Sequence, residues 1–176
     1  MEGGNDLVWQ PLVRARLGML DLEWFQREVR YCRVPNGTAG DRVRQIGGRY
    51  SDRTDFDFMM RMGVWTEDLA LPAVLNECLL QSHAGVIRVF PNTKNLGPAR
   101  FENLRAVGAF LVSAAWDGRQ VTACRIFSER GRVARVVRPW PGAVVKKDGR
   151  AVPAQREQDK LVFRTEAGAT YTIVKS

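Results

Sequence analysis

Histidine is almost absent from this chain, and cysteine is rare. Among 176 residues there is one histidine, His83, and there are three cysteines, Cys32, Cys78 and Cys124. The cysteines are far apart and odd in number, which argues against both a metal-ligand spacing and a disulfide framework. We therefore expect them to be small buried hydrophobic residues. His83 has no second histidine or cysteine at ligand spacing, so we predict no metal site and no cofactor.

Long hydrophobic runs are also missing. No stretch of about 18 consecutive apolar residues occurs, so we expect no membrane span. The first residues, Met-Glu-Gly-Gly-Asn-Asp, contain neither the basic region nor the apolar region of a signal peptide. If a larger parent protein is secreted or periplasmic, we expect its signal upstream of this piece. The localisation of the chain itself stays open.

Acidic residues are scarce in the last third of the chain. Residues 1–118 hold 14 Lys/Arg and 14 Asp/Glu, whereas residues 119–176 hold 13 and 5, so the net charge of +8 falls entirely in the second part. Such a surface is compatible with nucleic acid, anionic lipid or an acidic glycan. No nucleic-acid motif supports the first partner. We favour the solvent-exposed face of a half-buried sheet, because the arginines alternate along apparent strands: Arg125, Arg132, Arg135, Arg138 and Arg164.

The N-terminal part has helical patterns. Apolar spacing predicts helices within residues 7–31, broken at Gly18 and Asp21, with Asp21 capping a second helix from Leu22 to Tyr31. Residues 33–63 contain Pro-Asn-Gly and Gly-Gly signals, so we expect a long loop. Loops of this length in compact domains are often functional.

A third helix is predicted to begin at Thr66, where two acidic residues follow a plausible cap. Pro72 fits only near a first turn, because proline has no backbone N–H. The pattern continues to Ser82, and Ala84-Gly85 is expected to end the helix after His83.

After Gly85 the apolar period changes from 3.6 residues to two. Asp117-Gly118 and Asp148-Gly149 are hairpin signals, since a type I′ turn needs positive φ at both central residues. Helices followed by many short strands indicate an α+β chain, with a few N-terminal helices and then an antiparallel β-sandwich. The expected strands are 86–90, 109–116, 120–128, 133–137, 143–147, 150–153, 160–164 and 170–174.

Four segments within residues 66–142 carry a family resemblance. They are Glu77-Cys-Leu-Leu-Gln-Ser-His-Ala-Gly-Val-Ile-Arg-Val-Phe-Pro91, Leu104-Arg-Ala-Val-Gly-Ala-Phe110, Trp116-Asp-Gly118 and Arg138-Pro-Trp-Pro-Gly142. In this order and at similar separations they resemble the C-terminal part of glycoside hydrolase family 95, the α-L-fucosidase family. The resemblance implies that residues 1–84 are the last helices of an (α/α)6 barrel and that residues 85–176 are a C-terminal β-sandwich domain.

The resemblance also implies where the chemistry lies. In the family, the general-acid Glu and the water-positioning Asn residues lie far upstream, and nothing in this chain matches them. A further catalytic Asp comes just before the Gln-Ser-His segment. An ungapped count from Glu77 places Thr66 there, followed by Glu67 and Asp68. We take Glu67 and Asp68 as catalytic candidates; alternatively, both acids only complement a helix dipole.

The implied parent protein is an inverting O-glycoside hydrolase, which needs a carboxylic acid on one side of the sugar and a base on the other. The isolated chain is then expected to be inactive on α-L-fucosyl or related glycosides. Its expected partners are the glycoside and the parent's upstream catalytic barrel. Apolar helix faces that would line such a barrel also make a homo-oligomer plausible. The alternative function is a non-catalytic carbohydrate-binding or structural sandwich.

Two tryptophans are candidates for stacking on a sugar. Trp65 lies next to the predicted catalytic turn, and Trp140 lies between two prolines. For both residues the alternative is packing in a core, and for Trp140 we favour it. For His83 we favour a structural hydrogen bond or a contact with a helix dipole.

Overall fold

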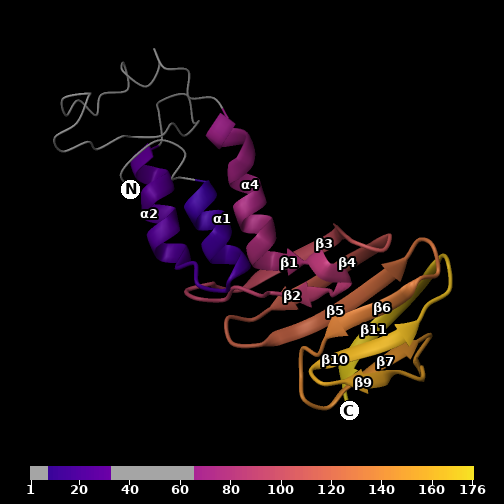
Figure 1. The fold of residues 1–176 in the computed structure, drawn as a ribbon. Coiled ribbons are helices and arrows are strands. Elements are labelled where there is room, and N and C mark those ends of the chain that lie inside the picture. The colour runs from indigo at the N-terminus through magenta and orange to yellow at the C-terminus, as the bar shows by residue number, and fades with distance from the viewer. Residues whose placement is uncertain (1–7, 33–65) are drawn as a thin grey trace, which may run out of the picture. The chain divides into compact units, whose positions relative to one another are not determined.

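The structure of this chain is a computed structural model that describes residues 8–32 and 66–176. The chain folds into two compact units. The first, here called the helical unit, ends at Cys78 and also includes Asn92–Asn95. The second, the β unit, consists of Leu79–Pro91 and Leu96–Ser176. In the described ranges, three helices precede a set of antiparallel sheets (Figure 1), which confirms the predicted α+β class.

The helical unit contains α1 (Trp9–Arg16), α2 (Leu22–Cys32) and α4 (Thr66–Leu79). Asp21 caps α2 as predicted, because its Oδ1 accepts hydrogen bonds from the backbone N–H groups of Glu23 and Trp24, both at 3.1 Å. The buried apolar side chains of this unit form one cluster: Val8, Ala15, Leu20, Phe25, Val74 and Cys78.

Two expectations for α4 are wrong. Pro72 lies in the interior of α4 and not in its first turn. Because proline has no backbone N–H, the helix lacks one of its backbone hydrogen bonds at this point. The helix also ends at Leu79, before the predicted end at Ser82–His83. The Leu79 C=O accepts a bond from the N–H of Phe90 at 2.7 Å, and β1 (Leu80–Gln81) pairs with β2 (Arg88–Val89). Pairing with a segment that comes later in the sequence therefore ends the helix. The local apolar periodicity does not predict such a pairing.

The β unit contains two further sheets around a shared core. The larger sheet has the order β3-β4-β5-β11-β7-β8, the smaller has the order β6-β10-β9, and neighbouring strands are antiparallel. Ile126 and Ile173 of the larger sheet and Val136 and Leu161 of the smaller one belong to the same buried cluster, as expected for a sandwich. The strands are β3 (Ala99–Ala106), β4 (Phe110–Trp116), β5 (Val121–Ser128), β6 (Val133–Val137), β7 (Ala143–Lys147), β8 (Arg150–Ala151), β9 (Gln155–Glu157), β10 (Lys160–Arg164) and β11 (Ala169–Lys175).

The two predicted hairpins differ in their turns. Between β7 and β8, Asp148 and Gly149 both have positive φ, at 50° and 76°, which is the predicted type I′ geometry. Between β4 and β5, Gly118 alone has positive φ, at 100°. There the Asp117 Oδ1 accepts the backbone N–H groups of Arg119 and Gln120 at 2.8 Å, so the side chain closes a longer loop.

β3 and β9 were missed by the sequence prediction. In β9 all three residues are exposed, so no apolar alternation marks it. β3 contains a bulge, because its register against β4 shifts between Phe101 and Leu104. Within the bulge Asn103 has a φ of 56°, and its N–H donates to the Ser113 Oγ at 3.0 Å. The extra residue breaks the period of two on which the strand prediction depends.

The two cysteines whose side chains are described are free and buried, as predicted. Burial raises the pKa of the Cys78 thiol to about 11 and that of Cys124 to about 12. Both thiols are therefore protonated at neutral pH and behave as small apolar groups.

We expect the hairpin of β1 and β2 to contribute to the stability of the β unit. Ile87 is 1% exposed within the β core. Replacing Ile87 with Ala should reduce the free energy of unfolding by about 2–5 kcal/mol through lost burial and a residual cavity. Urea denaturation followed by circular dichroism measures the change. As a control, Val133→Ala at a position 42% exposed should stay within about 0.5 kcal/mol; an equally small effect for Ile87→Ala would contradict the packing of the hairpin.

Candidate functional site

The predicted catalytic residues lie at the beginning of α4. Glu67 and Asp68 follow Thr66, the first residue of the helix, so the helix begins where the sequence predicted. The structure describes the backbone of Glu67 and Asp68 but not their side chains, and Trp65 lies outside the described residues. The roles assigned to these three residues therefore stay predictions.

Trp140 lies between β6 and β7, in the core of the β unit. Its side chain is 7% exposed, and its indole Nε1 donates to the Val121 carbonyl at 2.8 Å. The Lys175 Nζ lies 5.9 Å from the ring centroid, within the range of a cation–π contact. This geometry supports the core-packing alternative, and the burial of the ring counts against stacking on a sugar.

His83 is exposed and does not lie at the end of an α-helix. It begins a short 3₁₀ turn, His83–Gly85, in which Ala84 has a φ of 60°. α4 ends at Leu79, so His83 does not lie in the last turn of that helix as the sequence predicted. The neighbouring Ser82 Oγ accepts the backbone N–H of Val107 at 2.9 Å. Ser82 thus fixes the loop between β3 and β4.

The hairpin that carries this turn is anchored in the β unit. Leu80, Ile87 and Phe90 are buried in its core, and the Phe90 ring lies 5.4 Å from that of Phe101. Ile87 also bonds to β6 through its backbone: its N–H donates to the Arg135 carbonyl at 2.8 Å, and its C=O accepts from Val137 at 2.9 Å. The Gln-Ser-His segment is therefore a structural part of the β unit.

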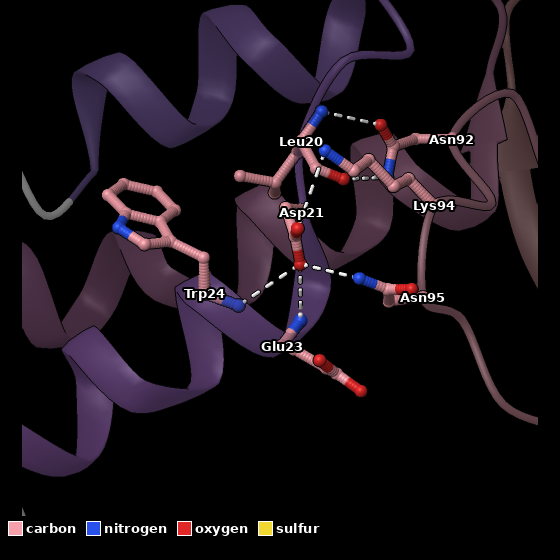
Figure 2. A network of polar contacts seen from close by, with 7 residues as sticks. All are labelled: Leu20, Asp21, Glu23, Trp24, Asn92, Lys94 and Asn95. Carbon is pink, nitrogen blue, oxygen red and sulfur yellow. Dashed lines mark hydrogen bonds and ion pairs between the residues drawn. The ribbon is translucent and has the colours of Figure 1, made fainter.

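A buried side-chain amide in the helical unit, that of Asn92, is hydrogen-bonded through both its oxygen and its nitrogen. Its Oδ1 accepts the backbone N–H of Leu20 at 2.8 Å, and its Nδ2 donates to the Leu20 C=O at 2.9 Å (Figure 2). Both residues are fully buried. The side-chain amide thus satisfies the donor and the acceptor of one backbone residue in the turn between α1 and α2, where an unpaired group would be costly.

Asp21, the residue after Leu20, belongs to the same hydrogen-bond network. Its Oδ1 accepts from the Asn95 Nδ2 at 2.9 Å, and its Oδ2 lies 3.4 Å from the Lys94 Nζ (Figure 2). The Lys94 C=O accepts the N–H of Leu22 at 3.3 Å. The hydrogen bond from Asn95 lowers the pKa of Asp21 to about 2, with further lowering by the Trp24 N–H and by Lys94. Asn92–Asn95 therefore clamps the α1–α2 turn, and we call this network the turn clamp.

The sequence prediction missed the turn clamp. Its local signal is the polar run Asn92-Thr-Lys-Asn95 directly after Pro91. Such a run normally indicates an exposed loop, and only the distant pairing with Leu20 distinguishes it. Among the residues that the structure describes, no three His, Cys, Asp or Glu side chains lie close enough to hold a metal ion. No helix in those same ranges is long and apolar enough to cross a membrane.

Comparison with known families decides what the β unit is. Residues 81–173 match glycoside hydrolase family 95, C-terminal domain. The chain belongs to this family. No curated protein matches the chain in sequence. The family-95 match begins in β1 and ends in β11, so it contains Asn92–Asn95: a segment of the C-terminal domain belongs to the helical unit.

The predicted boundary between residues 84 and 85 falls within the hairpin. The first division between the two compact units lies between Cys78 and Leu79, and the predicted domain boundary stays a prediction. The assignment of the helices to a barrel stays a prediction.

Removing the Asn92 amide should destabilise the helical unit. Asn92→Leu keeps a similar volume but leaves the buried N–H and C=O of Leu20 without partners, which should cost about 1–3 kcal/mol for each group. Thermal unfolding followed by circular dichroism measures the loss. The control is Asn95→Gly, because the amide at this position is exposed, water replaces the lost bond, and glycine tolerates the φ of 57° without strain. Equal effects of the two variants would contradict the role given to Asn92.

The turn clamp should also make stability depend on acid pH. The pKa of Asp21 is lower in the folded chain than its usual value near 4, so the ionised carboxylate stabilises the fold above that pH. This stabilisation should be lost as the pH falls from about 4 to about 2. Asp21→Asn retains a capping side chain but loses the charge. Its melting temperature should lie below that of the wild type at pH 6 and converge with it near pH 2; a gap that persists at pH 2 would contradict this.

Proposed function

We propose that this chain forms the closing helices and the C-terminal domain of an inverting, α-L-fucosidase-like glycoside hydrolase acting on α-L-fucosyl or related glycosides. One observation carries the proposal: Asn92–Asn95 lies inside the family-95 match and completes the helical unit. A sandwich that only accompanied a catalytic domain would not need to supply this segment.

The proposed role of the C-terminal domain is to position the helices. The turn clamp fixes Leu20, which packs in one cluster with Val74 and Cys78 of α4. α4 is the helix at whose start Glu67 and Asp68 lie. Catalytic groups must be held in a productive geometry by rigid elements. In this proposal the clamp serves that purpose for the beginning of α4, through the helical core.

The chemistry is divided between this chain and the upstream barrel. Inverting hydrolysis uses two carboxyl groups about 6.5–9.5 Å apart, one to protonate the leaving oxygen and one to activate water. The resemblance assigns a carboxylate near the start of α4, with Glu67 as the first candidate, and assigns the general acid to the upstream barrel. The chain alone then lacks one of the two groups.

The alternative, a non-catalytic sugar-binding sandwich, has less support. Sugar-binding faces usually present aromatic rings. Within the described β unit, the large apolar residues with the greatest exposure are Val107 and Val133, at 59% and 42%, and neither is aromatic.

An activity assay tests the division of the chemistry. The chain alone, incubated with 4-nitrophenyl α-L-fucoside, should release no nitrophenol above background, because a single carboxylate does not support inversion. Glu67→Gln should be indistinguishable from the wild type. Turnover by the wild type that Glu67→Gln abolishes would overturn the proposal that the site is divided.

The genomic sequence gives a second, independent test. The proposal expects an open reading frame that continues upstream of Met1 and encodes further helices with an acidic residue at the family's general-acid position. A stop codon immediately upstream, in a genome that encodes no separate barrel, would contradict it.

A further inference from the structure

The outer face of the larger sheet has a shallow hollow of about 310 Å³. Ala115 of β4 and Ala123 of β5 form its floor; they are directly opposite each other in the strand register. Because both side chains are small, the surface is lower here than at the larger residues of neighbouring rows. The polar residues around the floor come from four adjacent strands: Arg100, Glu102, Ser113, Arg125 and Thr172.

Positive charge dominates this hollow. Arg125 is exposed, and its guanidinium has no hydrogen-bond or ion-pair partner among the residues that the structure describes. The Arg100 Nε lies 3.7 Å from the Glu102 Oε1, and both side chains are largely exposed. Lys146 of β7 stands opposite Thr172 of β11 in the register and adds a third cation at the margin. The hollow and its margin therefore carry three cations and one carboxylate.

The two hydroxyl groups of the hollow differ in whether they already have a hydrogen-bond partner. The Ser113 Oγ is already used, because it accepts the Asn103 N–H at 3.0 Å and lies 3.4 Å from the Asn103 Oδ1. Ser113 thus fixes the bulge of β3. Arg100 and Glu102 are on the same strand. The Thr172 hydroxyl is exposed and has no partner in the described part of the chain. Thr172 is therefore available to a ligand beside Arg125, its neighbour in the register.

We propose that this hollow binds one anionic sugar residue through the carboxylate or sulfate group of that sugar. A guanidinium presents a planar fork of N–H donors that fits such a group with two parallel hydrogen bonds. Thr172 and Glu102 supply a hydroxyl and a carboxylate for the ring hydroxyls, and the alanine floor allows the ring to approach. The volume lies at the lower end of the range of about 300–1,000 Å³ for ligand sites, which suits a single sugar unit.

The two parts of this proposal have different foundations. The anion part rests on the unpaired Arg125 and on the surrounding charges. The sugar part rests on the proposed function, because a glycoside hydrolase works where glycans are present. Nucleic acid is disfavoured as the ligand, since single strands are held by stacking on exposed aromatic rings. The aromatic residue that lines the hollow, Phe101, packs in the β core and is only 7% exposed, so its ring is not available for stacking. The excess of arginine in the sequence is then partly a binding feature and not only a solvated face.

A binding titration of the complete chain tests the proposal. Sodium glucuronate, glucose and sodium acetate are added separately at constant ionic strength, and amide shifts are followed by ¹⁵N–¹H NMR. Glucuronate should bind saturably and shift amides of β4, β5 and β11, whereas glucose and acetate should bind at least tenfold more weakly. Arg125→Gln should weaken glucuronate binding at least tenfold, and Thr172→Val should weaken it a few-fold.

The matched control is Arg135→Gln. Arg135 is an exposed arginine on β6 of the smaller sheet and does not line the hollow. This variant should change glucuronate affinity less than twofold. An equal loss for Arg135→Gln and Arg125→Gln would overturn the site in favour of diffuse attraction to a basic surface, and so would tighter binding of an oligonucleotide than of glucuronate.

The remaining outcomes separate this proposal from the proposed function. Absence of saturable glucuronate binding would overturn the hollow as a site and leave the role of the turn clamp untouched, because that role is tested by stability and turnover. Acetate binding as tight as glucuronate binding, and equally sensitive to Arg125→Gln, would overturn the sugar part.

Discussion

The arrangement of the helical unit depends on the pair of hydrogen bonds between the Asn92 amide and the backbone of Leu20. A turn between two helices leaves backbone groups without helical partners, and burying Leu20 removes the water that would otherwise satisfy them. Asn92 supplies one donor and one acceptor at the same point. With the turn satisfied, the Leu20 side chain packs with Val74 and Cys78 of α4 in the helical core. A segment inside the family-95 match thereby determines whether this core can close.

Several parts of the fold were predictable because their cause is local. The Asp21 cap and the Asp148-Gly149 turn each depend on one side chain or on one pair of dihedral angles. The predicted end of α4 failed for the opposite reason, since a bond from Phe90, eleven residues beyond Leu79, competes with helix continuation. The turn clamp joins residues 72 positions apart, and such a pairing leaves no periodic trace in a single sequence. β9, with no buried residue, leaves none either.

The candidate sites also differ in whether their features have a local cause in the sequence. Alternation predicted that Arg125 lies on a wet sheet face, and it does, because side-chain direction follows from a period of two. The hollow beside it needs the register of β3, β4, β5 and β11, which sequence alone does not provide. For Trp140, between two prolines, the sequence left sugar stacking and core packing open and favoured the core; its indole is buried and bonded to Val121, which agrees with core packing. Glu67 and Asp68 rest on the resemblance and on the start of α4.

The bulge in β3 has a consequence for how copies of this chain meet. β3 stands at one end of the larger sheet, where an open row of backbone donors and acceptors invites another molecule to add a strand. Asn103, with its left-handed backbone, interrupts that row, and exposed Arg100 and Glu102 lie on the same strand. A second molecule would therefore meet an irregular and charged edge at β3, which is a poor template for strand addition. The contact of Asn103 with Ser113 that holds the bulge thus also makes the β3 edge less regular, and bulges and charges on an edge strand disfavour pairing with another chain.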